Sequence, residues 1–265
     1  MDTFQSIIIA IIEGLTEFLP VSSTAHMRFA NPIIGVHPDA FVDMFEIVIQ
    51  LAAILSVVTI YYKKFFNFKK LDFYYKLIIA VIPALIGGYF LKKHIDEVLD
   101  NISFMAYVMI GGGIVLLFID KLFKKPTVTN EDNISMMQSF IIGCYQVLSI
   151  LFPGLSRSAA TIIGGMSQKL NRSVAAEFSF FLAVPTMVAA SAKSFMDVYK
   201  DHKEVLVKDN FITLGTGAMV AYIVALISVK FFITYIQKHG FKVFGWYRIV
   251  MGIAILALVA QGIIK

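Results

Sequence analysis

The chain has 265 residues, of which 58% are hydrophobic and 15% are charged, and its mean hydropathy is +0.78. Soluble domains carry roughly a quarter charged residues, so this composition excludes an ordinary soluble domain and, with several apolar runs of about 20 residues, predicts an all-α polytopic membrane protein. The formal net charge of +5 is spread over short loops, which favours a role in membrane topology and argues against nucleic-acid binding.

The first predicted element is a re-entrant helix–loop–helix hairpin over residues 4–34. An apolar helix begins near Phe4 and runs to Leu19, where Pro20 stops it because proline lacks an N–H and disfavours helical geometry in the residue before it. The stretch Ile11–Met27 reads I-I-E-G-L-T-E-F-L-P-V-S-S-T-A-H-M. This helix is short for a membrane span, and irregular backbone is tolerated at membrane depth where protein or water covers it.

Three apolar runs after this hairpin predict full membrane spans, at residues 41–62, 74–91 and 102–123. The second half repeats the plan, with a hairpin followed by three further spans. These elements are the hairpin at 135–166 and the spans at 174–196, 211–236 and 244–264. Three consecutive glycines in the third span predict close approach of another helix, and Trp246 and Tyr247 near the start of the last span read as anchors at the membrane interface.

The two halves, residues 1–125 and 134–265, match in register. Aligning Pro20 with Pro153 places Glu13 on Gln146, Ser23 on Ser156 and Thr24 on Arg157. Because each half holds an odd number of spans, the second half enters the membrane with opposite topology. The sequence therefore predicts one membrane domain, 1–265, with six transmembrane helices plus two re-entrant hairpins in an inverted-topology repeat, whose polar loops meet near the midplane.

Loop charge predicts the orientation of this domain. The loops at 63–73, 121–135, 167–173 and 237–243 share one face and are rich in lysine and arginine. The opposite face holds both termini and the acids Asp39, Asp96, Glu97, Asp100, Asp201, Glu204 and Asp209. The positive-inside rule makes the basic face cytoplasmic, so both termini and the mouth of the site are expected on the outer face of the plasma membrane.

The two polar loops together hold an unusual set of groups for a membrane interior. They are Glu13, Glu17, Ser22, Ser23, Thr24 and His26 in the first, and Ser156, Arg157, Ser158 and Thr161 in the second. Intramembrane ionisable groups are functional candidates by default. Arg157 offers a planar fork suited to phosphate oxygens, and hydroxyls and N–H groups at a helix start add donors.

The acidic pair and the hydroxyls predict phosphoryl-transfer chemistry. Glu13 and Glu17 share one helix face and repel phosphate, so they are candidates to hold a divalent cation such as Mg²⁺ or to accept protons. Ser23 beside His26 is a candidate nucleophile, with His26 or a glutamate as base. A cation, an arginine and an activated oxygen together stabilise a transferring phosphoryl group.

Structural roles compete with these assignments. Intramembrane glutamates also serve as helix-packing or proton-relay groups, and membrane serines such as Ser22 usually bond their own backbone. Glu46, Gln50 and Glu177, near the starts of their spans, are open between support of the site from behind and packing within the repeat. A structural explanation is hardest to find for Arg157, in an apolar segment beside glycine and serine.

Two loop sequences, E-G-L-T-E-F-L-P-V-S-S-T-A-H and P-G-L-S-R-S-A-A-T, resemble the two signature loops of the undecaprenyl-pyrophosphate phosphatase family of the bacitracin-resistance type. Phe45–Leu51 (F-E-I-V-I-Q-L) and Ala176–Pro185 (A-E-F-S-F-F-L-A-V-P) also match its pattern. The resemblance covers nearly the whole chain. It implies an integral membrane hydrolase that removes the terminal phosphate of C55 isoprenoid pyrophosphate, with a divalent cation, Mg²⁺ or Ca²⁺, and so recycles the lipid carrier for peptidoglycan and other envelope polymers.

The resemblance also implies roles for individual residues. Carried over by position, Glu13 and Glu17 match the family's acidic pair, Ser23 and His26 its proposed nucleophile and partner, and Arg157 its phosphate-binding arginine. The family often has glycine at two loop positions that are alanine here, Ala25 and Ala159. Alanine restricts φ, so the loop backbone is where this chain departs from the family.

Several alternatives stay open at this stage. A metal-activated water is a rival to Ser23 as nucleophile. Inverted repeats with paired re-entrant loops are also transporter architecture, so a transporter or flippase for a phosphorylated lipid or an anion is the second hypothesis. The expected partners are undecaprenyl pyrophosphate and membrane lipid, and the oligomeric state is open, with a homodimer as one candidate.

Overall fold

The computed structural model describes residues 1–91, 98–99 and 101–264, and within these ranges its regular structure is helical apart from one isolated bridge between Val128 and Leu170. Six helices are long and apolar enough to cross a membrane. They are α3 (Ala40–Ile60), α5 (Leu71–Phe90), α7 (Ile102–Leu122), α10 (Arg172–Asp201), α11 (Lys208–His239) and α12 (Lys242–Ala260). They coincide with the six predicted spans, which confirms the all-α polytopic class.

The remaining helices described are short. They are α1 (Thr3–Thr16), α2 (Ser23–Ile33), α4 (Tyr62–Phe65), α8 (Met136–Leu151), α9 (Arg157–Ser167) and the 3₁₀ turns η1 (Glu131–Asn133) and η2 (Lys203–Val205). Among the acids expected on the outer face, Asp96, Glu97 and Asp100 lie outside the described residues.

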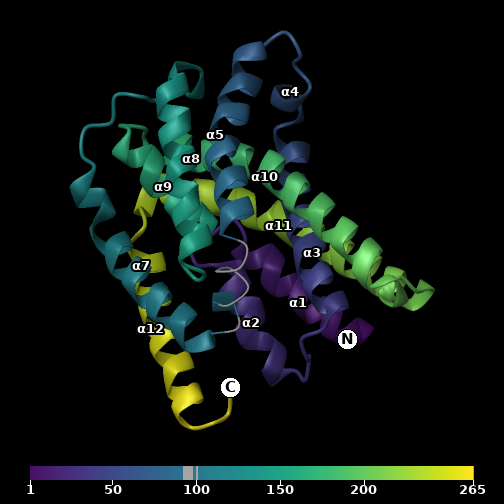
Figure 1. The fold of residues 1–265 in the computed structure, drawn as a ribbon. Coiled ribbons are helices and arrows are strands. Elements are labelled where there is room, and N and C mark those ends of the chain that lie inside the picture. The colour runs from purple at the N-terminus through teal and green to yellow at the C-terminus, as the bar shows by residue number, and fades with distance from the viewer. Residues whose placement is uncertain (92–97, 100, 265) are drawn as a thin grey trace.

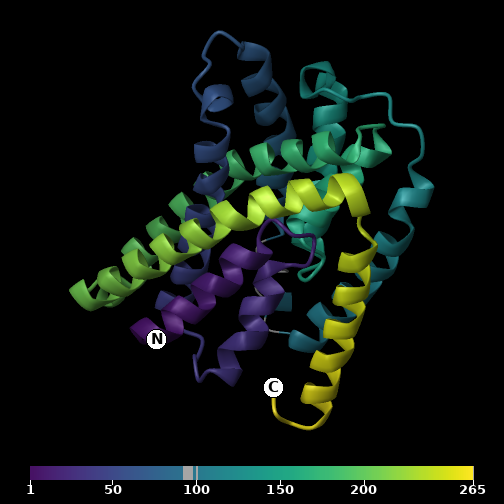
Figure 2. The same ribbon diagram turned by 180° about the vertical axis from the view of Figure 1, so that it is seen from behind.

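Two helix pairs, α1–α2 and α8–α9, occupy the middle of the molecule and open toward opposite ends (Figures 1 and 2). Both chain termini lie at the end toward which α1–α2 opens. The expected extent of the first helix, to Leu19, is wrong, because α1 ends at Thr16 with Glu17 as its cap. Pro20 has no N–H to donate to the carbonyl of Thr16, so the helix ends one turn before the proline.

Each pair is closed in the same way. Both first helices begin with a capping box, which satisfies N–H groups at the helix start. The glutamine of each box then reaches the end of the second helix of its pair. Gln5 Nε2 donates to the carbonyl of Ile34 at 3.0 Å, and Gln138 Nε2 to that of Gln168 at 2.9 Å. The two short helices of each pair are thereby tied together at their open ends.

The main helix contacts join one half of the chain to the other. The pairs in contact include α7 with α12, α1 with α11, α5 with α8, and α3 with both α10 and α11. Small residues permit this close approach: Gly113 on α7 meets the backbone of Gly245 on α12, and Gly143 on α8 meets that of Ala80 on α5. Neither half therefore has a separate core.

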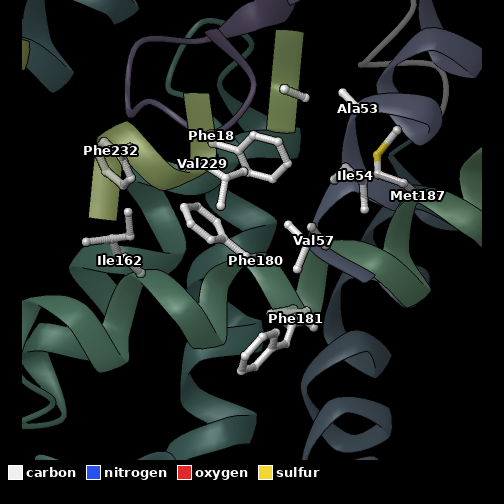
Figure 3. Close-up of a cluster of buried hydrophobic side chains, with 14 of the residues drawn as sticks. Phe18, Ala53, Ile54, Val57, Ile162, Phe180, Phe181, Met187, Val229 and Phe232 are labelled. Atoms are coloured by element: carbon white, nitrogen blue, oxygen red, sulfur yellow. The ribbon is translucent and has the colours of Figure 1, made fainter. Parts of the chain in front are cut away.

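The apolar core lies beneath the tip of the first helix pair. Phe18, Phe180, Phe181 and Phe232 are fully buried there, with Val229 beside them (Figure 3). The rings of Phe18 and Phe180 meet edge to face with centroids 4.9 Å apart, a favourable aromatic geometry. Because Phe18 directly follows Glu17, this contact fixes the polar loop to the core.

Candidate active site

The second helix of each pair begins at a serine with unusual backbone geometry. Ser22 and Ser156 have φ of +73° and +75°, and each side chain accepts a hydrogen bond from the N–H three residues later, at 3.4 and 3.2 Å. The predicted register, which paired Ser23 with Ser156, is wrong by one residue, because one residue separates Pro20 from Ser22 whereas two, Gly154 and Leu155, separate Pro153 from Ser156. Ser23 and Arg157 therefore occupy the same first position of their helices.

One carboxylate joins the two loops. Glu17 accepts a hydrogen bond from Ser23 Oγ at 2.5 Å through Oε2 and pairs with Arg157 Nη2 at 2.6 Å through Oε1. Arg157 Nη1 also donates to the carbonyl of Ser179 on α10 at 3.3 Å. The side chains of Glu17 and Arg157 are 6% and 14% exposed. A buried, charge-assisted pair of this kind is strong and directional, and it connects residues 140 positions apart.

Glu13 lies one turn before Glu17 and is fully buried, yet neither of its carboxylate oxygens has a hydrogen-bond partner among the described residues. A buried carboxylate without a partner is costly and fits a site for a bound cation or a proton. No group of three or more acidic, histidine or cysteine side chains forms a metal cluster within the described ranges. Mg²⁺ commonly uses one or two carboxylates together with substrate phosphates, so the Glu13–Glu17 pair fits a divalent cation shared with a phosphate ligand.

His26 is engaged away from Ser23. Its Nδ1 lies 2.7 Å from the carbonyl oxygen of Ser22, and its Nε2 lies 2.7 Å from the hydroxyl of Tyr247 on α12. The sequence predicts Tyr247 only as an anchor at the membrane interface and gives no sign of its contact with His26. Both ring nitrogens of His26 are therefore engaged with other groups. The Ser23 hydroxyl donates to Glu17, so of the two candidate bases, His26 and a glutamate, it is the glutamate that contacts Ser23.

The hydroxyl groups of the second loop hold the two loops together. Ser158 Oγ donates to the carbonyl of Leu19 at 3.0 Å and lies 2.9 Å from Ser156 Oγ. Thr161 Oγ1 lies 2.6 Å from Ser179 Oγ. These bonds fix the backbone around Arg157, because serine and threonine side chains in membrane helices commonly hydrogen-bond to nearby protein groups. In the first loop, Thr24 is half-buried in the first turn of α2.

The three polar residues near the span starts lie in different surroundings. Glu46 on α3 is buried and accepts a hydrogen bond from Asn31 of α2 at 2.7 Å, and so it supports the first helix pair from behind. Gln50 is half-buried one turn further along. Glu177 lies 3.6 Å from Lys64 of α4, so its ionic contact is with the neighbouring short helix and not with either polar loop.

The sequence reading missed Arg248, which is fully buried in α12. Its guanidinium donates to Pro20 O of the first loop at 3.0 Å, to Gly154 O and Leu155 O of the second at 2.9 and 2.8 Å, and to Met109 O of α7 at 3.1 Å. No ion pair with a carboxylate forms within the described part of the chain. Arg248 thus clips both loops and a membrane helix through backbone carbonyls alone.

Two glycines of α7 make room for this clip. A Cβ at Gly112 would collide with Nη2 of Arg248, and one at Gly113 would lie 3.0 Å from the Arg248 Cβ. The signal was present in the sequence, since a charged residue inside an apolar span is costly and marks a functional site. The glycine run predicts close helix packing, which it also provides.

Comparisons with known proteins identify the family of the chain. The model of the family described as bacitracin resistance protein BacA matches residues 6–254. The chain is 49% identical over 259 residues to an undecaprenyl-diphosphatase of Flavobacterium johnsoniae, which covers 97% of this chain and 96% of that protein. Proteins of the same name from Porphyromonas gingivalis and Campylobacter jejuni are 44% and 40% identical over 279 and 271 residues, covering 99% and 100% of this chain and 99% and 97% of theirs. The chain therefore belongs to the BacA bacitracin resistance family.

Proposed function

We propose that the chain is an integral membrane phosphatase that hydrolyses undecaprenyl (C55 isoprenoid) pyrophosphate to the monophosphate and phosphate, and so recycles the lipid carrier for cell-envelope synthesis. Full-length relatives carrying the name undecaprenyl-diphosphatase support it. The observation that carries it is the single carboxylate of Glu17, bonded at once to the hydroxyl of Ser23 and to the guanidinium of Arg157. Glu17 thus links a hydroxyl that it can activate, that of Ser23, to a guanidinium that can bind phosphate oxygens, that of Arg157.

The proposed reaction uses Ser23 as nucleophile and Glu17 as base. Ser23 Oγ attacks the terminal phosphorus as Glu17 takes its proton, because the two groups already share a short hydrogen bond. The new O–P bond forms as the anhydride P–O bond breaks, and the isoprenoid monophosphate leaves. Water then cleaves the phosphoserine to release phosphate. Arg157 holds phosphoryl oxygens through its planar fork and stabilises the charge that develops. Direct attack by water is the rival step.

Glu13 and Glu17 are the proposed holders of a divalent cation, Mg²⁺ or Ca²⁺. The unpartnered oxygens of Glu13 support this assignment. A divalent cation when bound neutralises charge on the diphosphate. Glu13 then provides ligand oxygens, while Glu17 stays in contact with Ser23 and Arg157.

An apolar cavity is the proposed place for the start of the isoprenoid tail. Its volume is about 400 Å³, and its walls come from the end of α1, from α11 and from the start of α12. Leu19 and Val21 of the first polar loop line it, as does Tyr247, the residue that contacts His26. Continuity with the polar loops and the apolar walls support this placement, since ligand sites combine apolar walls with a few polar groups.

We also propose that the two helix pairs are re-entrant hairpins of an inverted repeat, with both termini on the outer face. The matching capping boxes, the matching glutamine contacts and the opposite directions of the two pairs support the repeat. The basic loops support the orientation. Assembly as a homodimer stays a prediction, which the mass of the purified protein in detergent will test.

Phosphate release from undecaprenyl pyrophosphate tests the proposal. Ser23→Ala and Arg157→Ala are expected to lose at least 10²-fold in kcat, because each removes a group that acts in the transition state, and chelator is expected to abolish wild-type activity. Ser167→Ala is the matched control, since that hydroxyl donates to the carbonyl of Gly164 and accepts from the side chain of Gln168, and neither partner belongs to a polar loop. Full activity of Ser23→Ala would exclude the serine nucleophile, and full activity of Arg157→Ala would exclude this site.

The transporter alternative has its own observation, the repeat of two helix pairs that meet at polar loops. Proteoliposomes containing the purified chain separate the two functions. Phosphate release without movement of lipid between leaflets supports the phosphatase, and lipid movement without phosphate release supports the transporter.

A further inference from the structure

A cavity of about 430 Å³ with several charged lining residues lies apart from the candidate active site. The end of α7 and the start of α10, which help to line it, lie at the end of the bundle opposite both termini (Figure 1). It lies where α7 ends, α10 begins and α11 approaches its end. Because these three helices are candidate spans, the cavity sits at the level where a bilayer has its headgroups. The lining residues used below are Asp120, Lys124, Lys125, Asn171, Arg172 and Ser173.

One wall of the cavity is a fixed ion pair. Asp120 Oδ1 accepts from Arg172 Nε at 2.7 Å, and its Oδ2 accepts from the backbone N–H of Phe241 at 3.0 Å. Gly240, with φ of +70°, packs directly beneath this pair, where a side chain would collide with Asp120. Both oxygens of the carboxylate are thus engaged, and the guanidinium of Arg172 is held in place from below.

The opposite wall is the linker after α7, which carries Lys124 and Lys125. The N–H groups of Thr127 and Val128 both donate to the carbonyl of Lys169 at 3.0 Å, and Asn171 N–H donates back to Val128 O at 3.0 Å. These bonds tie the linker to the turn between α9 and α10. The two lysines are therefore presented by an anchored segment.

The cavity carries excess positive charge. Its lining has three cationic side chains, Lys124, Lys125 and Arg172, against one carboxylate, Asp120. Within the described residues, neither Nη group of Arg172 has a hydrogen-bond acceptor, since the ion pair uses Nε. Ser173 adds a hydroxyl and lies in the first turn of the 30-residue α10, where the helix dipole also favours an anion.

From this geometry we propose that the cavity binds the phosphate group of an anionic membrane phospholipid. Guanidinium and ammonium groups recognise phosphate oxygens, and basic pockets between membrane helices at the cytoplasmic side bind anionic headgroups. The ligand's acyl chains would lie along the ends of α7, α10 and α11. This site is separate from Glu17 and Arg157, and it does not depend on the reaction proposed there.

The test is lipid binding by the full chain in detergent, measured by native mass spectrometry with phosphatidylglycerol, phosphatidylcholine or inorganic phosphate. Lys124→Gln/Lys125→Gln is expected to weaken phosphatidylglycerol binding about 30-fold, from about 1 kcal/mol for each basic residue at about 1.4 kcal/mol per tenfold. Ser173→Asp should weaken it as well, because it adds a negative charge to the cavity while suiting a helix start. The matched control is Lys63→Gln/Lys242→Gln, two exposed lysines outside the cavity.

The proposal holds when the cavity variants lose binding, the control stays within about twofold of the wild type, and phosphatidylcholine binds weakly. Equal losses in the two double variants would mean a general effect of surface charge and would overturn the site. Equal binding of phosphatidylcholine would overturn the requirement for an anionic lipid. Competition by inorganic phosphate at equal concentration would assign the cavity to a soluble phosphate and overturn the lipid source.

Discussion

Arg248 is a single side chain that holds five backbone carbonyl groups of two loops and a membrane helix. Lysine keeps its charge but offers a compact donor instead of a planar fork. We expect Arg248→Lys to fold and to lose about 10²-fold in kcat, because small displacements of catalytic groups cost that much. Kinetics and the melting temperature in detergent check this. Wild-type kcat in Arg248→Lys would contradict a positioning role.

Glu13 and Glu17 are expected to respond in opposite ways to the same change. Glu13→Gln replaces a buried carboxyl group whose oxygens have no hydrogen-bond partner within the described residues, so the melting temperature should stay or rise, while the Mg²⁺ concentration for half-maximal activity should rise about tenfold. Glu17→Gln breaks the pair with Arg157 and should lower both stability and activity. Metal titrations and thermal unfolding of both variants measure this, and an unchanged metal requirement in Glu13→Gln would remove Glu13 from the cation site.

At the scale of residues, the sequence predicted that the polar side chains of the two loops lie close together, but not which of them form hydrogen bonds or ion pairs with one another. The polar character of Glu17, Ser23 and Arg157 was visible because each interrupts an apolar run. Pairing depends on side-chain direction at a helix start, which the positive φ of Ser22 sets, and a serine carries no sequence signal for that geometry. The contact between Tyr247 and His26 spans 221 positions, and so it follows only from the tertiary fold.

Helices α5 and α8 cross closely at Gly143, where a Cβ would collide with the backbone of Ala80. Gly143→Ala should cost about 1–3 kcal/mol through overpacking, seen as a lower melting temperature and yield. Gly111→Ala is the matched control, because no atom lies within 4 Å of a Cβ there and alanine favours helix. Equal stability of the two variants would contradict the close crossing.

At the scale of elements, hydropathy located the six spans because a bilayer requires long apolar helices. The ends were less predictable: α10 continues to Asp201, beyond the apolar run, and is helped there by an ion pair between Lys193 and Asp197 at 2.9 Å. Hydropathy does not predict where a helix ends when the helix continues beyond the hydrocarbon region of the bilayer. The starts of α2 and α9, inside the expected polar loops, likewise depend on side-chain caps.

The whole molecule has both termini at one end and the basic linker at the other. In a Cys144→Ser background, Asp2→Cys should react with a membrane-impermeant maleimide on intact cells, because the proposed orientation, from the positive-inside rule, places the basic face in the cytoplasm. Lys124→Cys should react only after the cells are permeabilised. The extent of labelling, read on gels, measures this, and the reverse pattern would invert the proposed orientation.

The ion pair between Glu17 and Arg157 also has a consequence for biosynthesis. The two residues are 140 positions apart, so at roughly 5–20 residues per second Arg157 leaves the ribosome on the order of ten seconds after Glu17. During that interval Glu17 lacks its ion-pair partner Arg157, and burying an unpaired charged carboxylate in hydrocarbon is costly. We therefore expect the segment that carries Glu13 and Glu17 to stay at the membrane surface until Arg157 has been made. Arg248, which holds both loops, lies in the last helix to be synthesised, so we expect the loops to take their final arrangement only when translation is almost finished.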